Sequence, residues 1–271
     1  MTIQDKNFSL SKICDSGQCF RMEMCSDDRY RLVAFDRYLE MAQAGDRITF
    51  DCTQEEFDHV WRDYFDLETD YAAVIARVDR EDAYLVSAAE YGRGIRILNQ
   101  DLWEMIVSFL ISQQNNITRI RRCIENICAS YGEKLESSQG KAYHAFPTPQ
   151  ALAVLSEDAL MACNLGYRSK YVVRAARDVA GGQCSLEAIR SLPYPKAKEE
   201  LLKLYGVGEK VADCVCLFAL HHLEAFPVDT HIRQAMEAHY KEGFPMERYE
   251  GCQGVLQQYI FYYELAGDRQ P

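Results

Sequence analysis

The spacing of apolar and polar residues divides the chain into parts with different periodicities. Over the first fifty residues, polar and apolar side chains alternate in short stretches such as Tyr30–Phe35 and Tyr38–Ala42, separated by turn-forming Gly and Asp residues. Alternation with a period of two between turns predicts an antiparallel meander. From Glu55 onward, apolar residues recur three or four positions apart, which predicts helices up to the break at Gly92–Gly94.

After Gln100 the pattern is almost wholly helical, and no strand is predicted there. Residues Trp103–Ile111 are strongly apolar, Ile117–Tyr131 are amphipathic, and prolines mark the loops. We therefore expect an α+β fold, with an N-terminal antiparallel β-sheet domain that also holds helices over residues 1–98. A larger all-α domain is expected over residues 99–271.

The composition is that of a globular protein. The chain has 271 residues, of which 48% are hydrophobic and 26% charged, so it has enough apolar surface to form cores. No apolar run approaches the roughly 18 to 20 residues needed to span a bilayer, and the first residues lack the apolar centre of a secretory signal. We expect a cytoplasmic protein with free thiols and no membrane partner.

The formal net charge of −11 argues at first against a nucleic-acid partner, because phosphate binders usually carry a basic surface. The acidity is uneven, however. Residues 1–98 hold 12 basic and 20 acidic side chains (net −8), which leaves 18 and 21 (net −3) for residues 99–271. The second part can therefore carry a local basic face.

A candidate phosphate-binding segment lies within Leu201–Phe218. It reads as the end of one helix, a turn through Gly206, Val207 and Gly208, and a second helix from about Glu209. The glycines leave backbone amides accessible at the start of the second helix, which favours an anion such as phosphate. This arrangement is typical of a helix-hairpin-helix that binds DNA.

Lys210 lies in the first turn of that second helix, where the helix dipole disfavours a cation and thus favours a nucleophilic amine. The alternative is a solvated lysine that only contacts phosphate. Further along, Asp229 can cap the helix that follows Pro227, and the same carboxylate could stabilise positive charge on a sugar. His231 could bind phosphate or pack in a core.

Together, Leu204–Asp213 and Val228–His231 resemble the helix-hairpin-helix superfamily of DNA base-excision glycosylases and, within it, the 8-oxoguanine DNA glycosylases. The resemblance implies a bifunctional enzyme that flips 8-oxoguanine out of duplex DNA and excises it. It then cleaves the abasic strand by β-elimination through a Schiff base on Lys210, with Asp229 stabilising the charge on the sugar. No cofactor is implied, and we expect a monomer that acts on DNA in the nucleoid or the nucleus.

The resemblance also assigns lesion recognition. Ser16–Arg21 resembles a block in which the glycine, Gly17 here, accepts a hydrogen bond at N7, where 8-oxoguanine carries a hydrogen and guanine does not. Gln257 and Phe261 lie four residues apart and would read and stack on the flipped base, with Cys214 on its other side. The resemblance places DNA backbone contacts at Gly206, Gly208, Val211 and His231, and a structural monovalent cation, but no catalytic metal, at the carbonyls of Leu202, Leu204 and Val207.

Two further blocks resemble the segments that meet the base opposite the lesion. Gln114 stands where the family has asparagine, and Arg119 matches an arginine in the same block. Tyr167 would insert into the base stack as a wedge, and Arg168 would contact the base left behind. The departure at Gln114 leaves the opposite-base preference open.

Two other kinds of function remain as alternatives. One is a glycosylase of the same superfamily that removes another damaged base, such as an alkylated base displaced by water without a lysine. Branches with an iron–sulfur cluster are excluded, because a cluster needs four thiolates and only Cys252 follows Asp229. The other is a non-catalytic DNA-binding module, whose function would survive the loss of Lys210.

Overall fold

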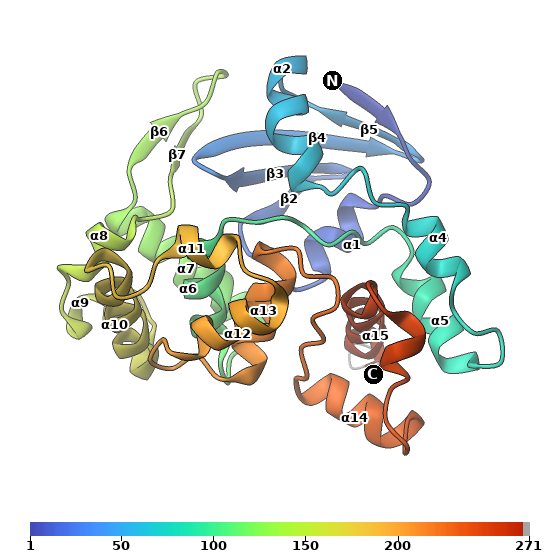
Figure 1. The fold of residues 1–271 in the computed structure, drawn as a ribbon. Coiled ribbons are helices and arrows are strands. Elements are labelled where there is room, and N and C mark those ends of the chain that lie inside the picture. The colour runs from blue at the N-terminus through green and yellow to red at the C-terminus, as the bar shows by residue number, and fades with distance from the viewer. Residues whose placement is uncertain (268–271) are drawn as a thin grey trace.

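Five antiparallel strands form the N-terminal sheet, in the order β1-β5-β4-β3-β2 (Figure 1). The structure is a computed structural model that describes residues 1–267. The strands are β1 (Thr2–Gln4), β2 (Met22–Ser26), β3 (Arg29–Ala34), β4 (Arg37–Ala44) and β5 (Arg47–Phe50). The register pairs Leu32 with Leu39 and Tyr30 with Met41, so the buried side chains of β3 and β4 share one face. The predicted meander is confirmed.

That apolar face packs against α1 (Leu10–Asp15) and a helical run over residues 54–64. The run comprises α2 (Gln54–Glu56), the π-helical turn η1 (Phe57–Trp61) and α3 (Arg62–Tyr64). Its buried stripe includes Phe57, whose ring centroid lies 5.1 Å from that of Phe50 on β5. The helical spacing from Glu55 onward is therefore confirmed, whereas α1 was not predicted.

The rest of the structure is mainly helical, as predicted. Its helices are α4 (Tyr71–Ala76), α5 (Ala83–Gly92), α6 (Leu102–Ser112), α7 (Ile117–Tyr131), α8 (Pro149–Ala153), α9 (Glu157–Met161), η2 (Gly166–Arg168), α10 (Ser169–Ala180), α11 (Leu186–Arg190), α12 (Tyr194–Leu202), α13 (Glu209–Ala219), α14 (Thr230–His239), η3 (Met246–Tyr249) and α15 (Gln253–Gly267). Within residues 1–267, none of these is long and apolar enough to cross a membrane.

The α+β fold class is confirmed, but the two cores do not divide the chain at one point. Helices α4 and α5 precede residue 98, yet they share a core with the later helices, and α5 packs beside α15 (Figure 1). The sheet and its covering helices form a second core. The boundary between domains 1–98 and 99–271 stays a prediction, and residues 268–271 lie outside the described residues.

A small hairpin interrupts the helical half, so the prediction of no strand after Gln100 is wrong. It is formed by β6 (Lys134–Glu136) and β7 (Ala142–His144), and it extends toward the sheet (Figure 1). The Tyr143 hydroxyl donates a hydrogen bond to the Asp36 carbonyl over 2.9 Å. The Tyr143 ring also contacts that of Tyr38, and Lys141 pairs with Glu40. Three-residue strands without a buried residue show no apolar alternation, so the sequence gives no local signal for this hairpin.

Arg96 joins the two halves from the segment between α5 and α6. Its side chain is only 2% exposed and forms an ion pair with Asp5 at 3.0 Å. The guanidinium also donates to the carbonyls of Phe65 and Thr69, each over 3.0 Å. Its five donors allow one side chain to bind several backbone carbonyls at once.

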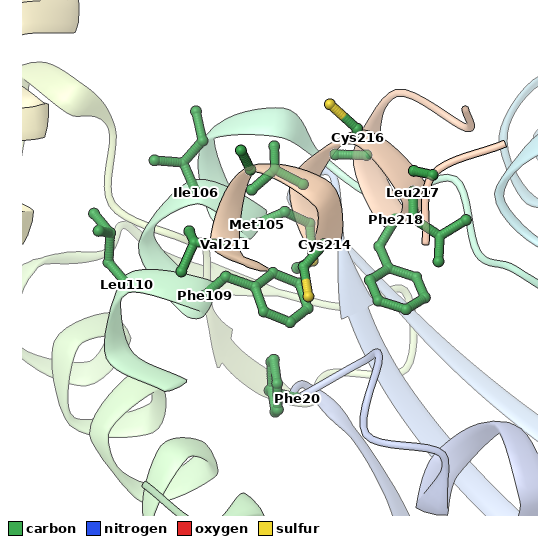
Figure 2. Packing of buried hydrophobic residues seen from close by; sticks show 14 of the residues in the cluster. Phe20, Met105, Ile106, Phe109, Leu110, Val211, Cys214, Cys216, Leu217 and Phe218 are labelled. Atoms are coloured by element: carbon green, nitrogen blue, oxygen red, sulfur yellow. The ribbon is translucent and has the colours of Figure 1, made fainter. Parts of the chain in front are cut away.

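Helices α6 and α13 pack side by side at the centre of the helical half (Figure 2). The rings of Phe109 on α6 and Phe218 on α13 are stacked, with centroids 5.7 Å apart. Phe20, from the loop after α1, meets Phe109 edge to face at 5.8 Å. This contact fixes the loop of residues 16–20 against α6, and Lys210, in the first turn of α13, lies over the same Phe109 ring.

Candidate active site

A cavity of about 600 Å³ opens where the loop after α1, the α6–α7 turn, α13, the start of α14 and α15 meet. A volume of this size can hold a nucleobase-sized ligand. The cavity brings together eight predicted residues: Gly17, Gln114, Lys210, Cys214, Asp229, His231, Gln257 and Phe261. The other predicted residues do not line it: Arg119, Tyr167, Arg168, Leu202, Leu204, Gly206, Val207, Gly208 and Val211.

Lys210 and Cys214 lie one helical turn apart on α13, so both face the cavity. The half-buried Lys210 has its Nζ 5.2 Å from the centroid of the Phe109 ring. Burial raises the pKa of the Cys214 thiol to about 11, and the Asp229 charge adds to this effect although Lys210 opposes it. The thiol is therefore neutral near pH 7, so Cys214 is suited to apolar contact and not to nucleophilic attack.

Asp229 caps α14, as predicted. Its Oδ1 accepts a hydrogen bond of 2.9 Å from the Ile232 backbone amide. The half-buried residue also lines the cavity that contains Lys210, so the cap holds the carboxylate at the cavity edge. Arg233 lies one turn further along α14 and lines the same cavity; the sequence analysis did not select it.

The Gly17 loop packs directly against α15. Gly17 has a φ of +76°, and a Cβ at this position would lie 3.1 Å from the Phe261 ring. The buried Gln258 donates to the Ser16 carbonyl over 2.7 Å, and Gln18 donates to the Ser16 hydroxyl over 3.0 Å. Within residues 1–267 no donor meets the Gly17 carbonyl, which leaves it able to accept a hydrogen bond.

Gln258 is a site residue that the sequence analysis missed, because its partner, the Ser16 carbonyl, lies far away in the sequence. The Gln257 side chain is also buried, and its Nε2 donates to the Pro227 carbonyl over 2.9 Å. Its Oε1 is buried and has no donor among the described residues. An unpaired buried acceptor is costly, so this amide is prepared to accept a hydrogen bond from a ligand in the cavity.

Phe261, near the Gln257 amide, offers a stacking surface. Phe261 is half-buried and lies one turn along α15 from Gln257, so both side chains face the cavity. The ring of His231 meets the Phe261 ring edge to face, with centroids 5.7 Å apart. A planar ligand could therefore lie against Phe261 while its edge meets Gln257.

Two of the residues predicted to meet the opposite base, Tyr167 and Arg168, lie against the turn that holds a third, Gln114. Tyr167 is 46% exposed, and its hydroxyl lies 3.4 Å from Oε1 of Gln114. Arg168 is only 3% exposed, and it donates to the carbonyls of Gln113 and Gln114, each over 2.7 Å. Its guanidinium therefore holds the Gln114 turn in this structure, and its contact with a base stays a prediction. Arg119 is exposed at the start of α7.

The helix-hairpin-helix consists of α12 and α13, and α13 begins at Glu209 as predicted. Gly206 has a φ of +91°, and a Cβ there would lie 2.6 Å from the Tyr171 ring, so the turn requires glycine. Gly208 has no side chain with which to cap α13, so its first amides stay accessible. Gln113 donates to the Gly206 carbonyl over 3.0 Å. This hydrogen bond connects the α6–α7 turn, which holds Gln114, to the hairpin.

The predicted cation site uses carbonyls of the same turn. The Leu204 carbonyl accepts a hydrogen bond of 3.0 Å from the Val207 amide. A carbonyl oxygen has two lone pairs, so this bond leaves one for a cation. The residues present are compatible with a monovalent cation, which stays a prediction.

Known proteins match the chain over most of its length. Residues 1–106 match the family described as 8-oxoguanine DNA glycosylase, N-terminal domain, and residues 107–244 match the HhH-GPD superfamily of base excision DNA repair proteins. A crystal structure of the Clostridium acetobutylicum 8-oxoguanine glycosylase/lyase, in complex with dsDNA containing cytosine opposite to 8-oxoG, is 36% identical in sequence. Its TM-score is 0.91, and the match covers 99% of this chain and 98% of that one.

Two curated relatives are also similar. An N-glycosylase/DNA lyase of Saccharomyces cerevisiae is 29% identical over 270 residues, which cover 89% of this chain and 70% of the yeast protein. An N-glycosylase/DNA lyase of Arabidopsis thaliana is 34% identical over 176 residues, which cover 64% of this chain and 48% of the plant protein.

Proposed function

Because the chain belongs to the 8-oxoguanine DNA glycosylases of the HhH-GPD superfamily, we propose that it excises 8-oxoguanine from duplex DNA with Lys210 as the nucleophile and then cleaves the abasic strand. The observation that carries this proposal is the shared cavity. Lys210 and Asp229 line it together with Gly17, Gln257 and Phe261. A nucleophile, a carboxylate and a base-binding surface thus meet around one space.

The reaction begins when Lys210, after losing a proton, attacks C1′ of the flipped nucleotide with the lone pair of Nζ. A bond forms between Nζ and C1′, and the glycosidic bond breaks, so that its electron pair leaves with the base. The new bond leaves Nζ positively charged, and the proton that it then gives up neutralises the departing base. The Asp229 carboxylate stabilises the positive charge that develops on the sugar. The sugar ring then opens to a Schiff base, and loss of a C2′ proton expels the 3′ phosphate by β-elimination.

Lesion recognition follows from the hydrogen-bonding groups that the cavity offers. The carbonyl of Gly17 accepts from N7–H, which 8-oxoguanine has and guanine lacks. The unpaired Oε1 of Gln257 accepts from the Watson–Crick edge of the same base. The base stacks between Phe261 and the neutral thiol of Cys214, with both faces shielded from water.

Borohydride trapping tests the assignment of Lys210, because borohydride reduces a Schiff base to a stable covalent bond. The substrate is a duplex containing 8-oxoguanine opposite each of the four bases in turn. We expect an adduct that needs both the lesion and Lys210, and that is absent in Lys210→Gln. The matched control is Lys203→Gln, because this exposed hairpin lysine already forms an ion pair with Glu200 at 2.6 Å.

The possible results separate the alternatives. An adduct that persists in Lys210→Gln would show that another group is the nucleophile. Base removal by the unaltered protein without an adduct would indicate a glycosylase that uses water. Binding without base removal would indicate a non-catalytic module. The four opposite bases also measure the preference that Gln114 leaves open.

The partner of the protein is double-stranded DNA that contains 8-oxoguanine. We place the protein in the compartment that holds this DNA, the nucleoid of a prokaryote or the nucleus of a eukaryote, and expect a monomer. Sedimentation of the protein with and without duplex DNA measures the oligomeric state.

A further inference from the structure

An arginine stacks on an exposed tyrosine next to the hairpin turn, outside the cavity. The guanidinium carbon of Arg174, on α10, lies 4.1 Å from the centroid of the Tyr205 ring. Tyr205 directly precedes Gly206 and is 42% exposed. The Tyr171 ring packs against the Tyr205 ring, and their centroids lie 5.5 Å apart. This group, Arg174 with Tyr205 and Tyr171, is called the Tyr205 ledge.

Arg174 and Lys170, one turn apart on α10, have no ion-pair partner among the described residues. Lys170 lies over Tyr171 at 5.2 Å, whereas Arg174 lies over Tyr205, next to the hairpin turn. Lys198 is bound to Glu209 at 2.7 Å and to Asp213 at 2.9 Å, and Lys203 is bound to Glu200. Within residues 1–267, no carboxylate lies within ion-pair distance of Arg174. The ledge therefore presents a cation whose charge nothing in the described chain neutralises.

The N–H groups of Arg174 are available to a ligand. The residue is exposed, with its guanidinium carbon over the Tyr205 ring, and its N–H groups donate no side-chain hydrogen bond among the described residues. A planar fork of donors matches the oxygens of a phosphate. Because the Tyr205 ring already restricts the guanidinium, binding an anion costs less conformational entropy than it would for a free arginine.

We propose that Arg174, held on Tyr205, binds a backbone phosphate of duplex DNA beside the phosphate that meets the amides of the hairpin. The inference rests on the proposed function, since it needs the hairpin to contact DNA. Glu209, the acidic side chain at the start of α13, is held by Lys198, which Asp213 shares. Its negative charge is therefore partly offset.

A phosphate contact carries no information about the base. The ledge therefore increases affinity for damaged and undamaged DNA equally and leaves the chemical step unchanged. Loss of one phosphate contact reduces the slope of log K against log salt concentration by about 0.9. This change in slope distinguishes a direct contact from a general loss of folding.

The experiment compares Arg174→Gln with Lys203→Gln, which removes the same charge from an ion pair that already exists. Affinity is measured by fluorescence anisotropy for 8-oxoguanine and undamaged duplexes at several salt concentrations. For Arg174→Gln we expect affinity to fall about 3- to 10-fold at low salt for both duplexes, and the salt slope to fall by about 0.9. Lys203→Gln changes neither quantity to this extent. The single-turnover cleavage rate at saturating protein stays unchanged.

The tyrosine provides a second, independent variant. Tyr205→Phe keeps the ring and retains full affinity, whereas Tyr205→Ala reproduces part of the loss. Adding Tyr205→Ala to Arg174→Gln causes no additional loss, because the two side chains act as a unit. Matching melting temperatures confirm that each variant is folded.

The inference is overturned if Arg174→Gln binds DNA like Lys203→Gln, or if its loss is confined to damaged DNA. These results are separable from those that concern the proposed function. An unaltered protein that binds DNA but excises no base contradicts the proposed function, while the salt slopes still test the ledge. Normal excision with unchanged slopes contradicts only the ledge.

Discussion

At the scale of single residues, Gly17 shows how one missing side chain shapes the cavity. Its positive φ and its distance from the Phe261 ring leave no room for a Cβ without a shift of the ring. The loop cannot retreat, because Gln258 holds the preceding carbonyl and Phe20 is packed against Phe109. Glycine is therefore required by the backbone conformation and by the stacking surface at once.

We predict that Gly17→Ala impairs lesion recognition as well as stability. The left-handed conformation costs alanine about 1–2 kcal/mol, and displacement of Phe261 disturbs the base-binding surface. The strained loop should no longer hold the carbonyl of residue 17 in place to accept from N7–H of the lesion. Selectivity for 8-oxoguanine over undamaged duplex should therefore fall about tenfold, which corresponds to the free energy of one hydrogen bond. Gly45→Ala is the control, since Gly45 has a φ of +63° and nothing within 4 Å of an added Cβ. Equal selectivity in both variants, measured by competition binding, would contradict the prediction.

Site residues whose contacts are local in the sequence could be predicted, whereas those whose contacts are distant could not. The Asp229 cap follows from an aspartate placed just before a helix, and the structure confirms it. The burial of Arg168 depends on carbonyls more than fifty residues away, at Gln113 and Gln114, and no local pattern reports such a contact. The same limit applies to Gln258, whose partner Ser16 lies at the other end of the chain.

At the scale of elements, a long amphipathic helix carries its own boundary signals. The segment Ile117–Tyr131 was predicted and observed with the same ends, because a capping asparagine precedes it and Gly132 follows it. The strands β6 and β7 have no such signals, since each has three residues and pairs only with the other. Their place is determined by contact with the sheet, which the sequence alone does not reveal.

The first turn of α6 gives a prediction about pH. Burial raises the pKa of Glu104 to about 7, although the nearby Arg21 opposes this shift. The folded pKa then lies above that of an unfolded glutamate, near 4.3. Protonation therefore favours the folded state, and the free energy of unfolding declines as pH rises from about 4.5 to about 7.

Glu104→Gln should remove this decline. Relative to the unaltered protein, we expect the variant to gain about 2 kcal/mol of stability between about pH 5 and about pH 7.5. Urea denaturation at a series of pH values measures the difference. Glu157→Gln, at an exposed first-turn position of α9, should keep the pH dependence of the unaltered protein. Parallel pH profiles for all three proteins would show that Glu104 is not responsible.

At the scale of the whole molecule, the sheet half and the helical half meet at Arg96. Replacing it with methionine would leave Asp5 without its ion-pair partner and the carbonyls of Phe65 and Thr69 without a donor. We expect Arg96→Met to lower the free energy of unfolding by about 3–5 kcal/mol. Arg93→Met is the control, because the Arg93 ion pair with Glu90 is exposed and its loss costs at most about 1 kcal/mol. Similar losses in the two variants, by urea denaturation, would contradict this account.

The packing of Gly17 on Phe261 also has a consequence for biosynthesis. The ribosome makes the loop after α1 early, but the ring that completes its surface comes from α15, near the end of the described chain. Until α15 has been translated, one wall of this cavity is missing. The core of the helical half is incomplete as well, because α15 contributes the buried side chains of Val255, Leu256, Tyr259 and Ile260 to it. The cavity and the core that supports it are therefore completed together, by the last helix of the described chain to be synthesised.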